Sequence, residues 1–260
     1  MLYYVHMGMV FFFIFGLIIG SFLNAVIYRL QSNESVACGR SRCFSCQHQL
    51  GFWDLIPVFS FIFLRARCRY CQQKISWQYP LVELATGGLF AWSYYYFFNN
   101  LIFSTVSSWY LVITLILISF CLIIFVYDLR YYLVADQIVW PIVIIMLLGN
   151  IFIFHLSLLS LFFTAAGLML FFWLQIVISH GHWLGSGDIL LGLLMGVSLG
   201  WPRGVIALLL AYWIGALIGL VLMLFKKKDL NSQIPFGPFL MLGLIITWFW
   251  GNQILTFIYG

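Results

Sequence analysis

The sequence has very few charged residues. Only 7% of its 260 residues are Asp, Glu, Lys or Arg, whereas 64% are hydrophobic, and the mean hydropathy is +1.07. This composition excludes a water-soluble globular protein, because its surface would be a continuous apolar patch. Acids are scarcest, with only seven Asp and Glu residues in the chain. An acid at the edge of an apolar run is therefore a candidate functional residue, since an ionisable group at membrane depth is costly.

Long apolar stretches recur along the whole chain. Crossing the hydrocarbon core of a bilayer, about 30 Å thick, takes about 20 apolar residues in a helix. The stretches predict an all-α polytopic membrane protein with about eight transmembrane helices in the lipid bilayer. The sixth stretch is short and rich in glycine. The expected spans are 8–28, 80–98, 108–127, 137–155, 158–179, 188–200, 204–225 and 237–258.

Positive charge predicts the orientation of these spans. No Lys or Arg precedes the first apolar run, which argues against a signal peptide and for a retained helix. Short cytoplasmic loops collect Lys and Arg, and eleven of the twelve such residues fall on one side of the expected membrane, with only Arg203 on the other. We therefore expect both chain ends outside and the net charge of +5 at the cytoplasmic face. Topology accounts for this charge, so no nucleic-acid partner is inferred.

One large loop, 31–79, separates the first two spans and contains five of the six cysteines. Four of them form two CxxC pairs separated by 21 residues: Cys43, Cys46, Cys68 and Cys71. This spacing is typical of two knuckles that deliver four thiolates to one tetrahedral zinc ion. A loop this small buries little apolar surface, so a metal would stabilise it. We predict a small cytoplasmic loop domain with a structural Zn²⁺.

Other uses of the loop and its cysteines remain open. Two disulfides are the main alternative, but structural disulfides are rare in the reducing cytoplasm. Cys38 or His48 could replace one thiolate, although neither has a partner at knuckle spacing. Cys121 lies deep in an apolar span and is expected to be a small core residue. The apolar segment 55–64 is too short to span, so we expect it to lie against the membrane surface or to pack within the zinc domain.

Two aspartates stand at the edges of apolar spans. Asp128 ends the third span, Asp188 in GSGDILL begins the sixth, and the two intervening spans return the chain to the same edge. Two carboxyls that share a water act as base and acid, and their like charges keep one proton in the pair. We predict peptide hydrolysis. Gly185 and Gly187 would add backbone freedom and a close approach of the substrate backbone.

Helix capping is the alternative interpretation of the acids. It fits Asp188, which opens a helix, better than Asp128, which ends one where the dipole disfavours a carboxylate. Asp136 directly precedes the fourth span and is expected to be its N-cap. Glu83, near the start of the second span, either reaches the interface or lines a polar site.

Five blocks of the sequence resemble, in order, the bacterial type IV prepilin peptidases, which are membrane aspartic proteases of the GxGD type. Together the blocks run through most of the chain. They are GSFLNAVIYRL at 20–30, RSRCFSCQHQLGFWDLIPVFSFIFLRARCRYCQQKISWQYPLVELATG at 40–87, DLRYYLVAD at 128–136, GSGDILLG at 185–192 and PFGPFLMLG at 235–243.

The resemblance implies that Asp128 and Asp188 are the catalytic pair and that the four cysteines bind zinc. It implies an enzyme of the bacterial cytoplasmic (inner) membrane with its active site facing the cytoplasm. Such enzymes cut the basic leader from prepilins and pseudopilins after a glycine, and most then methylate the new N-terminus from S-adenosylmethionine. The expected domains are a first transmembrane helix at 1–30, a methyltransferase-associated zinc loop at 31–79 and a transmembrane peptidase core at 80–260.

The chain departs from the family pattern at two positions. Ala135 stands where the family usually has proline before an acid, and Phe44 stands where proline usually follows the first cysteine. Competing hypotheses are a peptidase without methyl transfer and a non-enzymatic cation transporter or channel, which predicts acids distributed across the bilayer. A zinc-dependent hydrolase fits less well, since four thiolates leave no site for water. Glycines four apart, such as Gly192 and Gly196, favour close helix packing within the chain, and no homodimer is indicated.

Overall fold

The computed structural model describes residues 2–32, 34–35, 39–100, 105–225 and 234–260. Within these residues the regular elements are helices, accompanied by two isolated β-bridges. This confirms the all-α fold class. The chain divides into two compact units, Met1–Ile123 and Ile124–Gly260, which are described separately.

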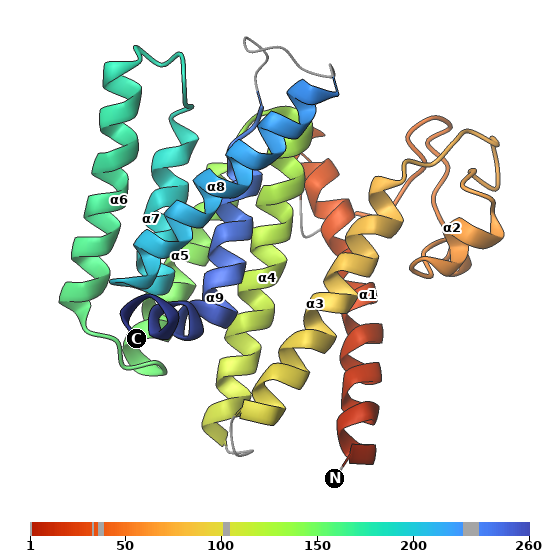
Figure 1. Ribbon diagram of the computed structural model, residues 1–260. Helices are drawn as coiled ribbons and strands as arrows, with labels where there is room; N and C mark the ends of the chain where they lie inside the picture. The colour runs from red at the N-terminus through yellow and green to blue at the C-terminus, as the bar shows by residue number, and fades with distance from the viewer. Residues whose placement is uncertain (1, 33, 36–38, 101–104, 226–233) are drawn as a thin grey trace. The chain divides into compact units, whose positions relative to one another are not determined.

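In the first unit, two long helices pack side by side (Figure 1). They are α1 (Leu2–Ser32) and α3 (Gln78–Asn100), and the loop between them holds η1 (Phe52–Asp54) and α2 (Phe59–Phe63). A Cβ atom added at Gly16 or Gly20 of α1 would lie 2.7 Å from a backbone Cα of α3. Glycine therefore allows the two helix backbones to approach closely, as in other membrane helix pairs. The first part of α4 (Thr105–Tyr131) completes this unit.

In the second unit, a short helix forms the core. This helix, α7 (Gly187–Leu199), contacts α5 (Asp136–Phe152), α6 (Leu158–Ile178), α8 (Arg203–Leu224) and α9 (Gly237–Tyr259). Leu191, Leu194 and Met195 of α7 are fully buried. The helix that carries Asp188 is thus surrounded by neighbours, which restricts its movement.

The carbonyl groups at the C-terminal end of α7 accept hydrogen bonds from a side chain of α5. The helix has 13 residues and at 1.5 Å per residue is about 20 Å long, less than the hydrocarbon thickness of about 30 Å. Its last carbonyl groups therefore need partners away from water. The buried amide of Asn150 donates to the carbonyls of Val197 and Ser198, the latter at 3.1 Å. Gly200 ends the helix at φ +63°, a conformation that suits glycine.

Each of the eight expected spans coincides with a helix. Five of these helices are long and apolar enough to cross a membrane, namely α1, α4, α6, α8 and α9. The apolar helices α5 and α7 are shorter, at 17 and 13 residues, and α3 is outside the group of five. A multi-pass membrane protein is therefore supported, and the count of eight spans stays a prediction.

We expect Gly196→Ala to destabilise the second unit. A Cβ atom there would overlap with the backbone of Ala165 in α6, and overpacking of this kind costs about 1–3 kcal/mol. Gly167→Ala is the matched control, because a Cβ at Gly167 meets nothing within 4 Å. Thermal unfolding in detergent should show a lower midpoint for the first variant alone. Equal midpoints for the two variants would contradict the α6–α7 packing.

Candidate active site and metal centre

Asp128 lies in the last turn of α4 and is held by the start of α9. Its side chain is buried, with the residue 6% exposed, and its Oδ2 accepts a hydrogen bond from the N–H of Gly237 at 2.9 Å. The N-terminal end of α9 places a positive partial charge beside this carboxylate. A Cβ atom at Gly237 would lie 2.5 Å from Asp128 Oδ2. A side chain at this position would therefore displace the Asp128 carboxylate, a constraint that the sequence block PFGPFLMLG did not reveal.

Asp188 lies in the first turn of α7 and is 7% exposed. Its Oδ2 accepts a hydrogen bond from the N–H of Gly185 at 3.3 Å, and its own N–H donates to the carbonyl of Gly185 at 3.1 Å. The carboxylate therefore closes the GSGD turn, in part as the capping interpretation expected. The Asp128 carboxylate lies close enough to act on it electrostatically, and Gly237, which binds Asp128, faces Leu191 one turn further along α7. The structure thus brings together the two aspartates that the topology predicted to meet.

The two glycines of the GSGD turn differ in their surroundings. A Cβ atom at Gly187 would lie 2.6 Å from Cβ of Val134, whereas one at Gly185 would meet nothing within 4 Å. Neither residue has a positive φ, so the expected backbone freedom is not used. Gly187 is needed because the start of α7 packs directly on the chain before α5.

A second polar pair lies near Asp188 and was not anticipated from the sequence. The hydroxyl of Tyr212 in α8 donates to Oε1 of Gln175 in α6 at 2.8 Å, and Tyr212 interacts electrostatically with Asp188. The Tyr212 ring lies 4.8 Å from the ring of Phe236, the residue before Gly237. The signal available in the sequence was Gln175 itself, a polar residue in an apolar helix.

The expectation that Asp136 is the N-cap of α5 was wrong. The helix begins at Asp136, and the N-cap is Ala135, which has the extended backbone conformation of a cap and no side-chain hydrogen bond. Asp136 is exposed in the first helical turn. Its carboxylate still lies near the positive end of the helix dipole, which explains an acid at this position.

Each CxxC pair lies in a small hairpin, and the two hairpins repeat the same pattern. An antiparallel bridge joins Arg42 to Gln49 around the first pair and Arg67 to Lys74 around the second. In each hairpin the first cysteine N–H donates to a backbone carbonyl five residues later, at 3.0 and 2.8 Å. The repeat gives two knuckles that present their thiols to a common point.

The four thiols fit one tetrahedral metal ion. The Sγ atoms of Cys43, Cys46, Cys68 and Cys71 all lie within 4.8 Å of one another, and those of Cys43 and Cys71 are 3.7 Å apart. Tetrahedral zinc with Zn–S bonds of about 2.3 Å separates its sulfur atoms by about 3.8 Å, whereas a disulfide requires about 2.05 Å. All four cysteines are free. Among the described residues, this is the only group of three or more possible metal ligands.

The thiols are electrostatically unequal. Burial raises the pKa of Cys43, but hydrogen bonds from the backbone N–H groups of Cys46 and Ser45 outweigh it and lower the pKa to about 7. At Cys71 the N–H of Gln73 lowers the pKa, but burial and contacts with the other three cysteines raise it to about 12. Four thiolates this close therefore need a cation to neutralise their charge.

The sequence offered His48 and Cys38 as alternative metal ligands. The ring of His48 lies 3.7 Å from the ring of Tyr70, and His48 is outside the cysteine group. Cys38 lies outside the described residues. The tetracysteine set is therefore the one that the structure supports as a metal site.

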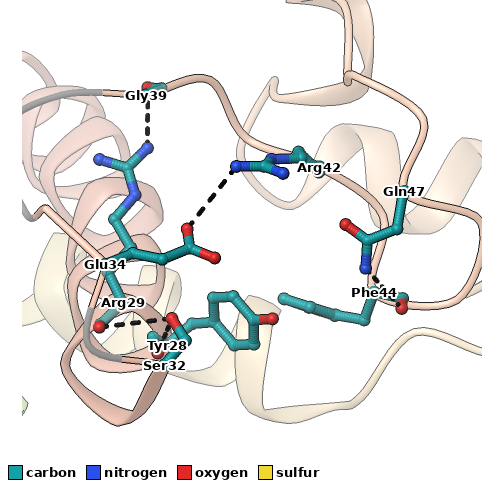
Figure 2. A network of polar contacts seen from close by, with 8 residues as sticks. All are labelled: Tyr28, Arg29, Ser32, Glu34, Gly39, Arg42, Phe44 and Gln47. Atoms are coloured by element: carbon teal, nitrogen blue, oxygen red, sulfur yellow. Dashed lines mark hydrogen bonds and ion pairs between the residues drawn. The ribbon is translucent and has the colours of Figure 1, made fainter.

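The end of α1 holds the first hairpin in place, as Figure 2 shows. Arg29 donates to the carbonyl of Gly39 at 2.8 Å, and Glu34 pairs with Arg42 at 3.9 Å. The ring of Phe44 lies 4.3 Å from the ring of Tyr28 in α1. This contact gives Phe44 a packing role at the position where proline was expected.

Comparison with known proteins identifies relatives over nearly the whole chain. The family models described as "Bacterial Peptidase A24 N-terminal domain" and "Type IV leader peptidase family" match residues 14–97 and 115–220. Three relatives are each named prepilin leader peptidase/N-methyltransferase. The one from Stutzerimonas stutzeri is 31% identical over 93% of this chain and 90% of its own, and the one from Legionella pneumophila 31% over 95% and 93%. The one from Bacillus subtilis is 32% identical over 94% and 95%. No solved structure gave a significant match.

Proposed function

We propose, because this chain belongs to the type IV leader peptidase family, that it cleaves prepilins with Asp128 and Asp188 and then methylates the new N-terminus. The observation that carries the proposal is the pairing of two buried, interacting aspartates from α4 and α7. Relatives named for both activities match more than nine-tenths of the chain. A cation transporter is not favoured, since the chain belongs to a peptidase family.

Hydrolysis by this pair needs one shared proton. The ionised carboxyl takes a proton from a water molecule as that water attacks the scissile carbonyl carbon, while the protonated carboxyl donates a hydrogen bond to the carbonyl oxygen. The tetrahedral intermediate then collapses: the carboxyl that took the proton from water gives it to the amide nitrogen, which leaves as the amine. Gly237 and Gly185 orient the carboxyls through their N–H groups. Both aspartates are buried, which limits their contact with bulk water.

The methyl transfer is proposed to depend on the loop domain 31–79, with S-adenosylmethionine as the donor of the methyl group. Cys43, Cys46, Cys68 and Cys71 would hold Zn²⁺, which supplies a structural cross-link, because four thiolates close its coordination shell. The support is that relatives are named for both activities, as prepilin leader peptidase/N-methyltransferase.

The active site is proposed to face the cytoplasm of the bacterial inner membrane. The support comes from eleven of the twelve Lys and Arg residues, which fall on one side of the expected topology together with both aspartates. A prepilin or pseudopilin, with an apolar helical stem in the bilayer, would present its leader at that face.

The test is a cleavage assay with the full chain reconstituted in lipid vesicles. A prepilin and S-adenosylmethionine are added, and the products are measured by mass spectrometry. We expect loss of the leader after a glycine and addition of one methyl group to the mature product. An intact prepilin would contradict the peptidase assignment. Cleavage without methylation would contradict the methyltransferase assignment and support a peptidase without methyl transfer.

We expect Gly187→Ala to lower the rate of cleavage by about 10²-fold, because a shift of roughly 1 Å in a catalytic group costs about that much. The added Cβ would meet Val134 and displace the start of α7, where Asp188 lies. Gly185→Ala is the matched control, since it keeps the N–H that binds Asp188 and has open space for its Cβ. Val134→Gly in the Gly187→Ala background should restore activity. Equal losses in the two single variants would refute the packing explanation.

A further inference from the structure

The loop between α1 and α3 exposes a cluster of large apolar side chains. Phe52, Trp53, Phe59, Ile62 and Phe63 are each between 58% and 80% exposed. We call residues 52–63, which include η1 and α2, the aromatic segment. Concentrated apolar exposure of this kind marks an interaction surface in a protein loop.

A hydrogen bond to a buried carboxylate fixes the position of the aromatic segment along α3. The backbone N–H of Val58 donates to Oε2 of Glu83 in α3 at 2.8 Å. Glu83 is buried and lies five residues after the start of α3, about 8 Å along the helix axis. Val58 has a φ of +61°, a conformation that β-branched residues rarely adopt. The hydrogen bond thus holds a strained backbone against the second turn of α3, which gives Glu83 a role the sequence left undecided.

A second contact ties the aromatic segment to the start of α3. The buried ring of Phe61 packs edge-on against Trp77, with 5.0 Å between the ring centroids. Trp77 directly precedes α3 and is itself exposed. Tryptophan at the end of a membrane helix is typical of the interface between headgroups and acyl chains. Because α3 packs along the candidate span α1, both contacts place the segment at the level where this helix pair would meet the membrane surface.

Basic side chains accompany the aromatic segment. Arg65, Arg67 and Lys74 are exposed, and none of them forms an ion pair with another residue in the described ranges. Arg69 differs, since it pairs with Asp54 at 2.9 Å. Each basic residue near an anionic membrane surface contributes about 1 kcal/mol of attraction. Apolar and basic groups together are the pattern of an interfacial membrane anchor.

We propose that the aromatic segment lies in the boundary between headgroups and acyl chains of the bilayer, with Arg65, Arg67 and Lys74 on anionic phospholipid headgroups. The loop domain 31–79 is then held against the membrane surface by a lipid contact, in addition to its links to α1 and α3. This inference does not depend on the proposed catalytic activity, because it follows from exposure, anchoring and charge alone.

The test measures the depth of Trp53 in the full chain. The protein is labelled with 5-fluorotryptophan, placed in nanodiscs of phosphatidylcholine and phosphatidylglycerol, and observed by ¹⁹F NMR. Trp53→Phe assigns the resonance. An acyl-chain spin label reports lipid contact, and a gadolinium chelate reports water contact. Trp213, 76% exposed on the candidate span α8, is the lipid reference, and free 5-fluorotryptophan is the water reference.

We expect the spin-labelled lipid to broaden Trp53 to an extent similar to Trp213, and the chelate to broaden it far less than the free amino acid. In discs of phosphatidylcholine alone, or with Arg65, Arg67 and Lys74 changed to Gln, access to the chelate should rise. Chelate access equal to that of the free amino acid in anionic discs would overturn the proposal. Shielding that appears only with added prepilin, or only at high protein concentration, would also overturn it and indicate a protein partner. Metal content per chain confirms that each variant keeps its loop domain.

Discussion

Asparagine in place of Asp188 is expected to lower the rate of prepilin cleavage by about 10³-fold, within the range that general acid–base groups contribute. The amide keeps the size and one hydrogen-bond acceptor of the carboxyl, so it can still accept from the N–H of Gly185. It can neither hold nor release the proton that the mechanism requires. The same loss is expected for Asp128→Asn, whose oxygen can still accept from Gly237.

Asp136→Asn is the matched control for these two variants. Asp136 lies close in sequence to Asp128, but it is exposed in the first turn of α5. We expect its cleavage rate to stay within about twofold of the native rate, since exposed substitutions change stability little. All three variants should show the native unfolding midpoint. If Asp136→Asn lost as much cleavage rate as the other two variants, the claim that only the buried pair is catalytic would be refuted.

Replacing Cys43 and Cys71 with serine is expected to remove the metal ion and unfold the loop domain. These two cysteines come from different knuckles and their Sγ atoms are 3.7 Å apart, so the change breaks both halves of the site. Structural zinc contributes about 10 kcal/mol or more to small domains that are unfolded without it. The loop domain has few other interactions that could replace this stabilisation, since its regular structure among the described residues consists of η1, α2 and two isolated bridges.

The measurements are the metal content per chain and the sensitivity of residues 39–79 to protease. We expect about one zinc ion per native chain, none in the double variant, and rapid cleavage of the loop only in that variant. Cys121→Ala is the control, because Cys121 is buried within α4 and outside the cysteine group. Retention of one metal ion by the serine variant would refute the tetracysteine site.

The parts of the site that the sequence predicted depend on local pattern and on counting spans. The two CxxC pairs have a spacing that specifies four ligands, whatever the course of the loop between them. Asp128 and Asp188 were placed together because two apolar runs lie between them and return the chain to one edge. Both arguments need only residue types and lengths.

The parts that the sequence did not predict depend on contacts between distant segments. The N–H of Gly237 reaches Asp128 across 109 positions, and the N–H of Val58 reaches Glu83 across 25. Backbone donors carry no residue signature, so no pattern marks them. Asp136 was misplaced for a local reason, since Ala135 takes the extended cap conformation without a capping side chain and helix ends shift easily by one residue.

The measurement that tests the central claim most directly is single-turnover cleavage by Asp128→Asn, Asp188→Asn and the double variant in the same vesicles. Residues that act as one unit are strongly non-additive, because the second change removes nothing that the first has left working. We predict that the double variant cleaves as slowly as either single variant. Its loss of rate should therefore be far smaller than the product of the two single losses. Near-native cleavage by either single variant would contradict the paired mechanism, and fully multiplicative losses would show that the two aspartates act independently.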